Sequence, residues 1–274
     1  MNAYSILEYE FNPRVAVGDV EPYLVRATEA SVAARAQFSA ELDILYGDSR
    51  LMTCDIFSAA QKDAPVHVFV HGGYWRGRDK SDYSFIAAAL VPKGITTIVI
   101  NYDLCPAVSV EKIVSEIDLF FDWLTSRVAN GKQRVVASGH SAGAHLIAMA
   151  DVLSQKIKTD GLGIDHAVLI SGLYDLRPVL EVSVNEIIGL TYDSAIGLSP
   201  SLSAVSLSMP VDVVVGGAES RSWISQSVNY ASQVNALEGC WVLDGHNHYS
   251  IMEELMAPQS DLAQLLVRRS HGNI

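Results

Sequence analysis

Residues 134–153 read RVVASGHSAGAHLIAMADVL, and the order of residue types in this stretch decides the fold. The apolar run in Arg134–Ser138 leads into Gly139-His140-Ser141-Ala142-Gly143, and the apolar run Ala144–Leu153 follows. A strand, a tight turn and a helix in this order predict a nucleophile elbow, G-x-S-x-G, with the serine in a strained conformation. The glycines let the helix approach the strand closely. An incidental glycine-rich turn is the alternative, and the flanking strand and helix argue against it.

Short apolar runs alternate with longer helical patterns from Val66 onward, which is typical of β-α-β units around a parallel sheet. A turn at Gly47-Asp48-Ser49 separates two further apolar runs, Leu42–Tyr46 and Leu51–Phe57, and predicts an antiparallel hairpin at one sheet edge. We therefore expect the α/β class, specifically an α/β-hydrolase fold with a mostly parallel central sheet and helices on both faces. The expected inner strands are Val66–Val70, Thr96–Ile100, Arg134–Ser138, Ala167–Ser171, Val211–Gly216 and Cys240–Leu243.

Helical spacing of apolar residues predicts three further helices. One covers Val20–Phe38 and is expected to edge the pocket, and its apolar positions are Leu24, Ala27, Val32 and Ala36. A second runs from Val110 to Val128 and buries one face on the sheet. The last is expected to begin at Ser250 with the capping box Ser-Ile-Met-Glu and to continue through Leu266.

Length and composition indicate one globular domain over residues 1–274. The chain has 49% hydrophobic and 18% charged residues, and no linker interrupts it. Residues 177–209, with Pro178, Pro200 and several serines, fit neither periodicity and are expected to form a small cap-like insertion. The formal charge of −12 argues against a nucleic-acid partner.

Three observations bear on location and assembly. No apolar run has the length of a signal peptide or a membrane span, so we expect no membrane association and a cytoplasmic protein. Cys54, Cys105 and Cys240 are far apart with no C-x-x-C pair, which indicates free thiols and no zinc site. We expect a small-molecule partner, no metal and no cofactor, and a homodimer stays open as an assembly.

A glycine-rich loop follows the first inner strand directly, in the sequence His71-Gly72-Gly73-Tyr74-Trp75. This fold places its oxyanion-hole loop there, and the second donor is the residue after the nucleophile. Gly72, Gly73 and Ala142 are therefore the predicted oxyanion donors. His71 is an alternative base, although a histidine at the end of a strand more often holds the loop in shape.

The triad order of this fold is serine, acid, histidine. Two histidines follow the last strand, and we favour His248 over His246 because His248 abuts the start of the helix. Glu219 is the one carboxylate in the turn after Val211–Gly216 and is the predicted acid. A surface charge is the alternative role for Glu219, and Asp212 and Asp244 are the alternative acids.

Several of these motifs together resemble the bacterial arylformamidase, or kynurenine formamidase-like, family of α/β hydrolases. The likeness is carried by His71–Trp75, Gly139–Gly143, Asn101-Tyr102-Asp103-Leu104 and Ser171-Gly172-Leu173-Tyr174-Asp175-Leu176, and it extends over nearly the whole chain. The resemblance implies an H-G-G-x-W oxyanion loop and a serine, acid and histidine triad that needs no metal or cofactor. It also implies His248, before the aromatic Tyr249, as the base and Glu219 as the acid. Better-known members use aspartate, so Glu219 is a departure.

The leading functional hypothesis is an arylformamidase that acts on N-formyl-kynurenine-like substrates. A carboxylesterase of short-chain acyl esters is the alternative, and a non-catalytic binding protein of the same fold is an outside alternative, against which the intact Ser, Glu and His order argues. Tyr74, Trp75 and Trp223 are candidate substrate-binding residues for an aromatic leaving group, with plain core packing as the alternative. We expect Trp75 and other bulky residues to crowd the acyl side of Ser141.

Overall fold

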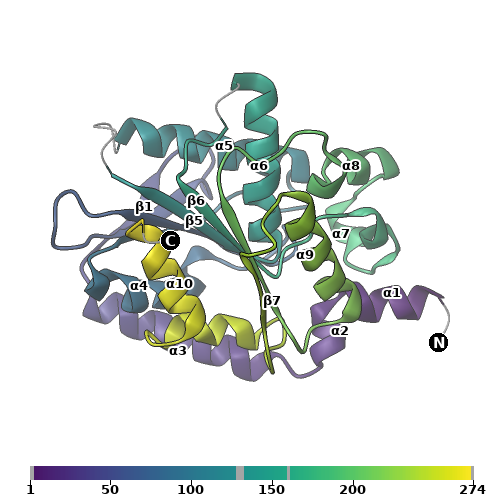
Figure 1. Ribbon diagram of the computed structural model, residues 1–274, viewed down its shortest axis with the longest axis horizontal. Coiled ribbons are helices and arrows are strands. Elements are labelled where there is room, and N and C mark those ends of the chain that lie inside the picture. The colour runs from purple at the N-terminus through teal and green to yellow at the C-terminus, as the bar shows by residue number, and fades with distance from the viewer. Residues whose placement is uncertain (1–2, 128–132, 159–160, 273–274) are drawn as a thin grey trace.

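The computed structural model describes residues 3–127, 133–158 and 161–272. Its centre is an eight-stranded sheet in the order β1-β2-β4-β3-β5-β6-β7-β8 (Figure 1). β1 and β2 form an antiparallel hairpin at one edge, β2 pairs antiparallel with β4, and the pairs from β4 to β8 are parallel. The strands are β1 (Ala40–Leu45), β2 (Thr53–Phe57), β3 (Val66–Val70), β4 (Thr96–Ile100), β5 (Val135–His140), β6 (His166–Ile170), β7 (Val211–Gly216) and β8 (Cys240–Leu243). The expected hairpin and all six expected inner strands are confirmed.

Alternating side chains divide the core into two layers. In β3, Val66, Val68 and Val70 pack into one hydrophobic cluster, and Phe69 packs into the other. Every residue of β3, β5, β6 and β7 is buried. Strands buried on both faces are typical of a parallel sheet sandwiched between helices, and this explains why these runs read as continuously apolar.

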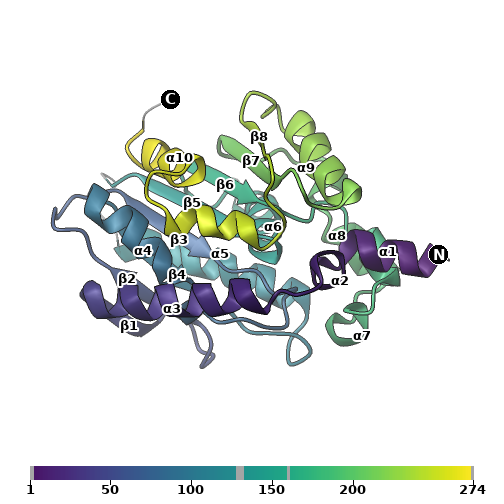
Figure 2. The same cartoon turned by 90° about the horizontal axis from the view of Figure 1, so that it is seen from below.

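Helices cover both faces of the sheet. α5 (Val110–Arg127) and α6 (Ala142–Lys158) lie on one face, and α3 (Glu21–Gln37), α4 (Phe85–Leu90) and α10 (Asp261–Ser270) lie on the other (Figures 1 and 2). The expected helix from Val110 is confirmed as far as Arg127, and Val128 lies outside the described residues. The remaining helical elements are α1 (Ala3–Phe11), α2 (Pro13–Val17), η1 (Lys80–Tyr83), η2 (Val91–Lys93), η3 (Arg177–Glu181), α7 (Asn185–Ile188), α8 (Tyr192–Gly197), η4 (Pro200–Leu202), α9 (Arg221–Gln233) and η5 (Ser250–Met256).

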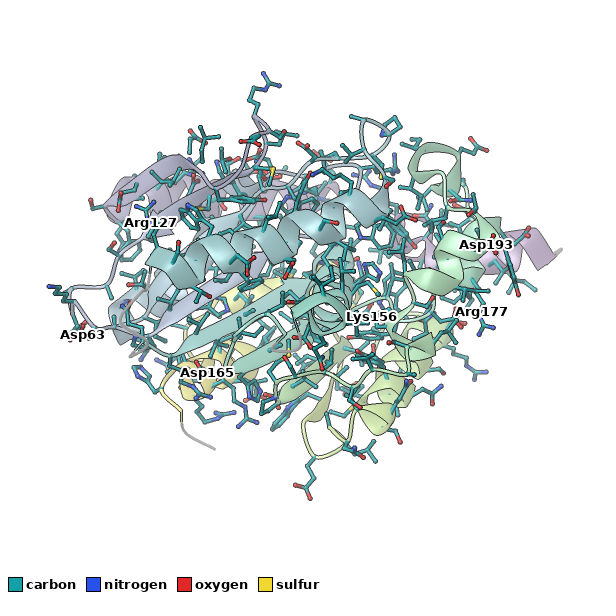
Figure 3. The ribbon with its side chains drawn as sticks, turned by 90° about the horizontal axis from the view of Figure 1, so that it is seen from above. Asp63, Arg127, Lys156, Asp165, Arg177 and Asp193 are labelled. Atoms are coloured by element: carbon teal, nitrogen blue, oxygen red, sulfur yellow. The ribbon has the colours of Figure 1, made fainter. Side chains whose placement is uncertain are left out.

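Charged side chains gather at the periphery. Figure 3 looks onto the face covered by α5 and α6, where six exposed charged residues point outward, namely Asp63, Arg127, Lys156, Asp165, Arg177 and Asp193. Within the described part of the chain, no helix is both long and apolar enough to span a bilayer.

α3 exists as expected, but it buries a different face. Val32 is 63% exposed, while Ala27, Ser31 and Ala34 are buried. These small residues face α4, and the Ser31 hydroxyl accepts a hydrogen bond from the Phe85 amide at 3.3 Å. Close helix approach therefore selects small side chains here, and the expectation that Val32 faces the core is wrong.

The expected last helix is two elements. η5 begins at Ser250, whose Oγ accepts from the Asn247 amide at 2.9 Å and makes no capping box. The helix ends before Pro258, which has no N–H to continue it. α10 starts anew with Ser260 as its N-cap, because its Oγ accepts from the Ala263 amide at 3.2 Å. The single helix and the capping box at Ser250 were wrong.

Residues 177–209 form four short helical elements, η3, α7, α8 and η4, between β6 and β7. They lie beside α1 at one end of the molecule (Figure 2). The Glu8 carboxylate of α1 accepts from the Ser183 amide and from its hydroxyl, both at 2.7 Å. The N-terminal helix and this insertion are therefore joined directly.

A buried ion cluster ties the C-terminal helix to the sheet. Asp212 of β7 is 1% exposed and accepts from Arg269 Nε at 2.6 Å and Nη2 at 2.9 Å. Its carboxylate also contacts His166 Nε2 at 2.7 Å and Trp241 Nε1 at 3.2 Å. Burial alone would raise the pKa of Asp212, but the hydrogen bonds from Arg269, His166 and Trp241 outweigh it and hold this pKa well below its usual range.

Asp212→Asn should lower the free energy of unfolding at pH 7 by about 3 kcal/mol, because it leaves Arg269 without its charge partner in a mostly buried setting. A depressed folded-state pKa contributes stability above the unfolded pKa of about 3.9, and this contribution is lost as the pH falls below it. The difference between wild type and variant in urea denaturation should therefore shrink below about pH 4. Asp175→Asn, which breaks the pair with the exposed Arg177, is the control and should change the free energy of unfolding much less. A difference that is constant from pH 7 to pH 3 would contradict the cluster's role.

Candidate active site

Ser141 stands at the turn between β5 and α6 with φ of 57°. This left-handed conformation is costly for a residue with a side chain, so the surrounding structure must hold it. The Ser141 amide donates to the Ile170 carbonyl at 2.8 Å, and the Ser141 carbonyl accepts from the His145 amide at 3.2 Å. A Cβ on Gly143 would lie 2.0 Å from the Val70 carbonyl oxygen. The strand, strained turn and helix predicted for G-x-S-x-G are present.

The predicted base and acid meet beside this turn. His248 Nδ1 lies 2.6 Å from Glu219 Oε2, and both side chains are almost fully buried. The other Glu219 oxygen accepts from Ser171 Oγ at 2.5 Å and from the Gly216 amide at 2.9 Å. Because Nδ1 is engaged by the carboxylate, Nε2 is the ring nitrogen left to exchange a proton. His248 and Ser141 line the same cavity.

The alternative bases and acids lie elsewhere. His246 contacts the Ser250 carbonyl at 3.2 Å and Glu254 at 3.3 Å, and it does not line the cavity. Asp212 is held in its own ion cluster, and Asp244 is exposed. His71 is buried with its Nδ1 2.7 Å from the Gly72 carbonyl oxygen, and burial lowers its pKa. Its position fits the expected role of shaping the loop.

The loop after β3 carries an unusual backbone. Gly73, Tyr74 and Trp75 all have positive φ, at 111°, 52° and 54°. A Cβ on Gly72 would lie 2.8 Å from the His140 carbonyl oxygen and 3.1 Å from the Ser141 Cβ, so only glycine permits this approach. Ala142 is the first residue of α6, where a helix leaves its amide N–H groups unpaired. Gly72 and Ala142 therefore lie directly beside Ser141, and Gly73 lines the same cavity.

The three predicted substrate-binding aromatics lie in different places. Tyr74 lines the cavity, and its hydroxyl donates to the Phe11 carbonyl. Trp75 is fully buried and packs edge-on against His145, with 4.9 Å between ring centroids. Trp223 donates Nε1 to the Ser171 carbonyl at 2.7 Å and packs edge-on against His248 at 4.6 Å. Trp75 and Trp223 stand outside the cavity lining, so they support the loop and the base and do not fit the expected contact with substrate.

The cavity beside Ser141 has a volume of about 560 Å³. Leu24 and Ala27 of α3 form part of its wall, as expected, and Met252 and Met256 of η5 add an apolar surface. Arg14, Arg76 and Arg78 also line it. In Figure 2, α2, α3 and η5 lie side by side, so the N-terminal and C-terminal segments close the cavity together. The insertion at 177–209 contributes Val184 to the lining.

Sequence reasoning missed two features of this site. Ser171, with φ of 49°, donates to Glu219, and no spacing rule connects residues 171 and 219. Arg76 and Arg78 closely follow the glycine-rich loop, and two arginines at this place in an acidic chain could have indicated a positively charged cavity. Across residues 3–127, 133–158 and 161–272, no group of three or more His, Cys, Asp or Glu side chains is arranged to hold a metal ion.

Known proteins resemble this chain in sequence. Residues 54–185 match a protein family described as BD-FAE. A kynurenine formamidase of Danio rerio is 30% identical to this chain, and the alignment covers 94% of the chain and 92% of the relative. A kynurenine formamidase of Drosophila melanogaster is 32% identical, with 81% of this chain and 78% of the relative covered.

Solved structures resemble it in fold. A protein of Silicibacter sp. TM1040 with a provisional thioesterase assignment is 30% identical, with a TM-score of 0.82 over 94% of this chain and 97% of that one. An esterase of Pyrobaculum calidifontis has a TM-score of 0.72 over 98% of this chain and 97% of that one. The esterase is 16% identical, so its likeness shows the fold alone. The sheet, its helices and these likenesses show an α/β-hydrolase fold.

Gly143→Ala should destabilise the protein strongly, because the new methyl group would meet the Val70 carbonyl at 2.0 Å and backbone on both sides prevents relief. Overpacking of this kind typically costs about 1–3 kcal/mol, and contact with fixed backbone places the change at or above the upper end. The midpoint of thermal unfolding reports the loss. Gly197→Ala is the matched control, because nothing lies within 4 Å of a Cβ at that position. Equal midpoints for the two variants would show that the contact with Val70 does not exclude a side chain at residue 143.

Proposed function

Since the chain belongs to the kynurenine formamidase family, we propose that it hydrolyses the formamide of an N-formyl arylamine such as N-formyl-kynurenine. Its relatives by sequence and its structural neighbours make it a hydrolase of the α/β-hydrolase fold. We assign the nucleophile to Ser141, the base to His248, the acid to Glu219 and the oxyanion donors to Gly72, Gly73 and Ala142.

One observation carries the formamide assignment, and it is the shape of the space around Ser141. The cavity extends from Ser141 to α2, α3 and η5, which form part of its wall. Gly72 and Ala142 lie beside Ser141 and, like Trp75 of the same loop as Gly72, are buried and form no part of this lining. A formyl group has no carbon chain to place, so the whole cavity is left for the arylamine. A volume of about 560 Å³ is typical of small-molecule sites and suits an aromatic amine.

The reaction begins when Ser141 Oγ attacks the formyl carbon and His248 Nε2 accepts the serine proton. The carbonyl oxygen becomes an oxyanion and accepts hydrogen bonds from the backbone N–H groups of the loop and of Ala142. The C–N bond then breaks, and the arylamine leaves with the proton from His248. Water, deprotonated by His248, attacks the formyl ester, releases formate and restores Ser141.

Glu219 stabilises the imidazolium form of His248 during both steps and fixes the ring tautomer. Its position is set by Ser171 Oγ and the Gly216 amide, which occupy the oxygen that His248 does not use. Trp223 packs edge-on against the imidazole and limits its rotation. Glutamate serves as well as aspartate here because the backbone turn brings its longer side chain to Nδ1.

A short-chain carboxylesterase is the second candidate. The apolar part of the lining, formed by Leu24, Met252 and Met256, would accept the alcohol of an ester as readily as an arylamine. Both reactions use the same steps, and only the leaving atom differs. A non-catalytic binding protein is disfavoured by the hydrogen-bonded His248 and Glu219 pair beside Ser141. We also propose a cytoplasmic location, supported by three free cysteines.

Ser141→Ala should lower kcat for N-formyl-kynurenine by about 10⁶-fold, because only the oxyanion hole and binding remain. His248→Ala should approach the same loss, and Glu219→Gln should lose about 10⁴-fold. His246→Ala is the matched control and should lose less than about tenfold. Thermal unfolding checks that each variant is folded. A larger loss of kcat for His246→Ala than for His248→Ala would show that His246 is the base.

Short acyl groups should be preferred strongly. An acyl chain too long for its side of Ser141 must be accommodated by strain of about 1–3 kcal/mol, which is a tenfold to hundredfold loss for each misfit. The kcat/KM values for N-formyl-kynurenine, phenyl acetate, phenyl butyrate and phenyl octanoate measure this. If kcat/KM stays constant or rises with acyl chain length and the formamide is not cleaved, the protein is a carboxylesterase and not a formamidase.

A further inference from the structure

The cavity beside Ser141 is cationic although the chain is acidic. The chain carries a formal net charge of −12, yet three arginines, Arg14, Arg76 and Arg78, line this cavity. Glu253 is the one carboxylate among the lining residues that the structure describes, and it is already paired with Arg26 at 2.5 Å. The cavity therefore holds positive charge in excess of what its own walls neutralise.

The backbone of Arg78 is in a strained conformation. Its φ of 73° is left-handed, and such strain in a residue with a side chain collects at sites that bind or react. One end of its guanidinium lies 3.2 Å from Asp82, and the group stands 5.9 Å from the Tyr83 ring centroid. Its Nε is buried and has no hydrogen-bond partner in the described part of the chain. The Arg78 side chain as a whole is 23% exposed and lines the cavity, so its remaining surface can meet a ligand.

Arg14 and Tyr249 complete the same part of the cavity. Arg14 stands in the first turn of α2, where the Asn12 side chain accepts from its amide at 3.2 Å. Arg14, Arg78 and Tyr249 all line the cavity, and burial raises the pKa of Tyr249 while the charges of Arg14 and Arg78 oppose that rise. Tyr249 directly follows His248 in the chain. Two guanidinium groups and one hydroxyl therefore face the space next to the base.

We propose that Arg78, together with Arg14 and Tyr249, forms a carboxylate-binding subsite for the leaving group of the substrate. A guanidinium presents parallel N–H donors that match both oxygens of a carboxylate. Asp82 contacts one Nη of the Arg78 guanidinium and orients it, while the part of the side chain that remains exposed lines the cavity. An acidic leaving group anchored here would be held with its acyl end at Ser141, which favours reaction by fixing orientation.

The subsite depends on the proposed function in one respect only, which is that the bond cleaved is a formamide. It acts on the leaving group, so it would select acidic amines and acidic alcohols alike. Arg76 is exposed at the same cavity and adds to the field that attracts an anion.

The first measurement compares N-formyl-kynurenine with its neutral α-carboxamide. Wild-type kcat/KM should favour the carboxylate by about 30-fold, the range expected for a hydrogen bond to a charged group. Arg78→Gln should reduce this ratio to less than about fivefold, and Arg78→Lys, which keeps the charge without the fork, should fall between. Arg127→Gln is the matched control, because Arg127 stands at the end of α5 over Trp123, away from the cavity (Figure 3), and should keep the wild-type ratio.

The second measurement does not require formamide cleavage. Kynurenine and its α-carboxamide are tested as competitive inhibitors of phenyl acetate hydrolysis, and kynurenine should inhibit about 30-fold more tightly in wild type but not in Arg78→Gln. If kynurenine inhibits in this Arg78-dependent way while no formamide is cleaved, the proposed formamidase function fails and the subsite stands. If acid and carboxamide are equal both as substrates and as inhibitors of the wild-type enzyme, the subsite is overturned, whichever acyl bond the enzyme cleaves.

Discussion

The contact between Gly143 and the carbonyl of Val70 governs the rest of the site. β3 and β5 are neighbours in the sheet, and α6 can leave β5 at the required angle only because residue 143 has no side chain to strike β3. The same contact sets the start of the glycine-rich loop, since His71 follows Val70 directly. The proposed nucleophile and the proposed oxyanion donors are thus positioned against each other by one backbone approach. Hydrogen bonds from Tyr102 to the His71 carbonyl at 2.7 Å then hold the loop from its other side.

The other half of the site depends on the parallel sheet. Glu219 and His248 follow β7 and β8, and parallel neighbours deliver the residues after their carboxyl ends to the same edge. The turns after the two strands are joined directly, because the Ala218 amide donates to the His246 carbonyl at 2.9 Å. Ser171, after β6, completes the row by binding Glu219. Three successive strands of the sheet therefore fix one proton-transfer pair with little freedom.

Much of this could be read from the sequence because the relevant signals are local. The elbow, the glycine-rich loop and the order of strands each occupy a few neighbouring residues whose backbone needs are specific. The location of the Trp75 ring cannot be predicted from the neighbouring residue types. Three residues with positive φ turn the ring into the core, and the apolar character of a tryptophan does not show whether it is buried or lines a cavity. Ser171 was missed for the same reason, since its partner lies 48 positions away. Pro258 did carry a signal for the end of η5, and the helical spacing beyond it obscured that signal.

The N-terminal helix has a further consequence for how the protein is made. The carbonyl of Phe11 binds Tyr74, and the Glu10 carboxylate accepts from the Ser222 amide at 2.8 Å, across 212 positions of chain. Residues 8–14 leave the ribosome long before α9, yet the surfaces they dock on are completed only when α9 has been synthesised. The wall of the cavity that contains Arg14 therefore cannot form during most of translation. The cavity is therefore complete only after α9 has been synthesised, and a chain truncated before α9 would expose the apolar side of α1 instead.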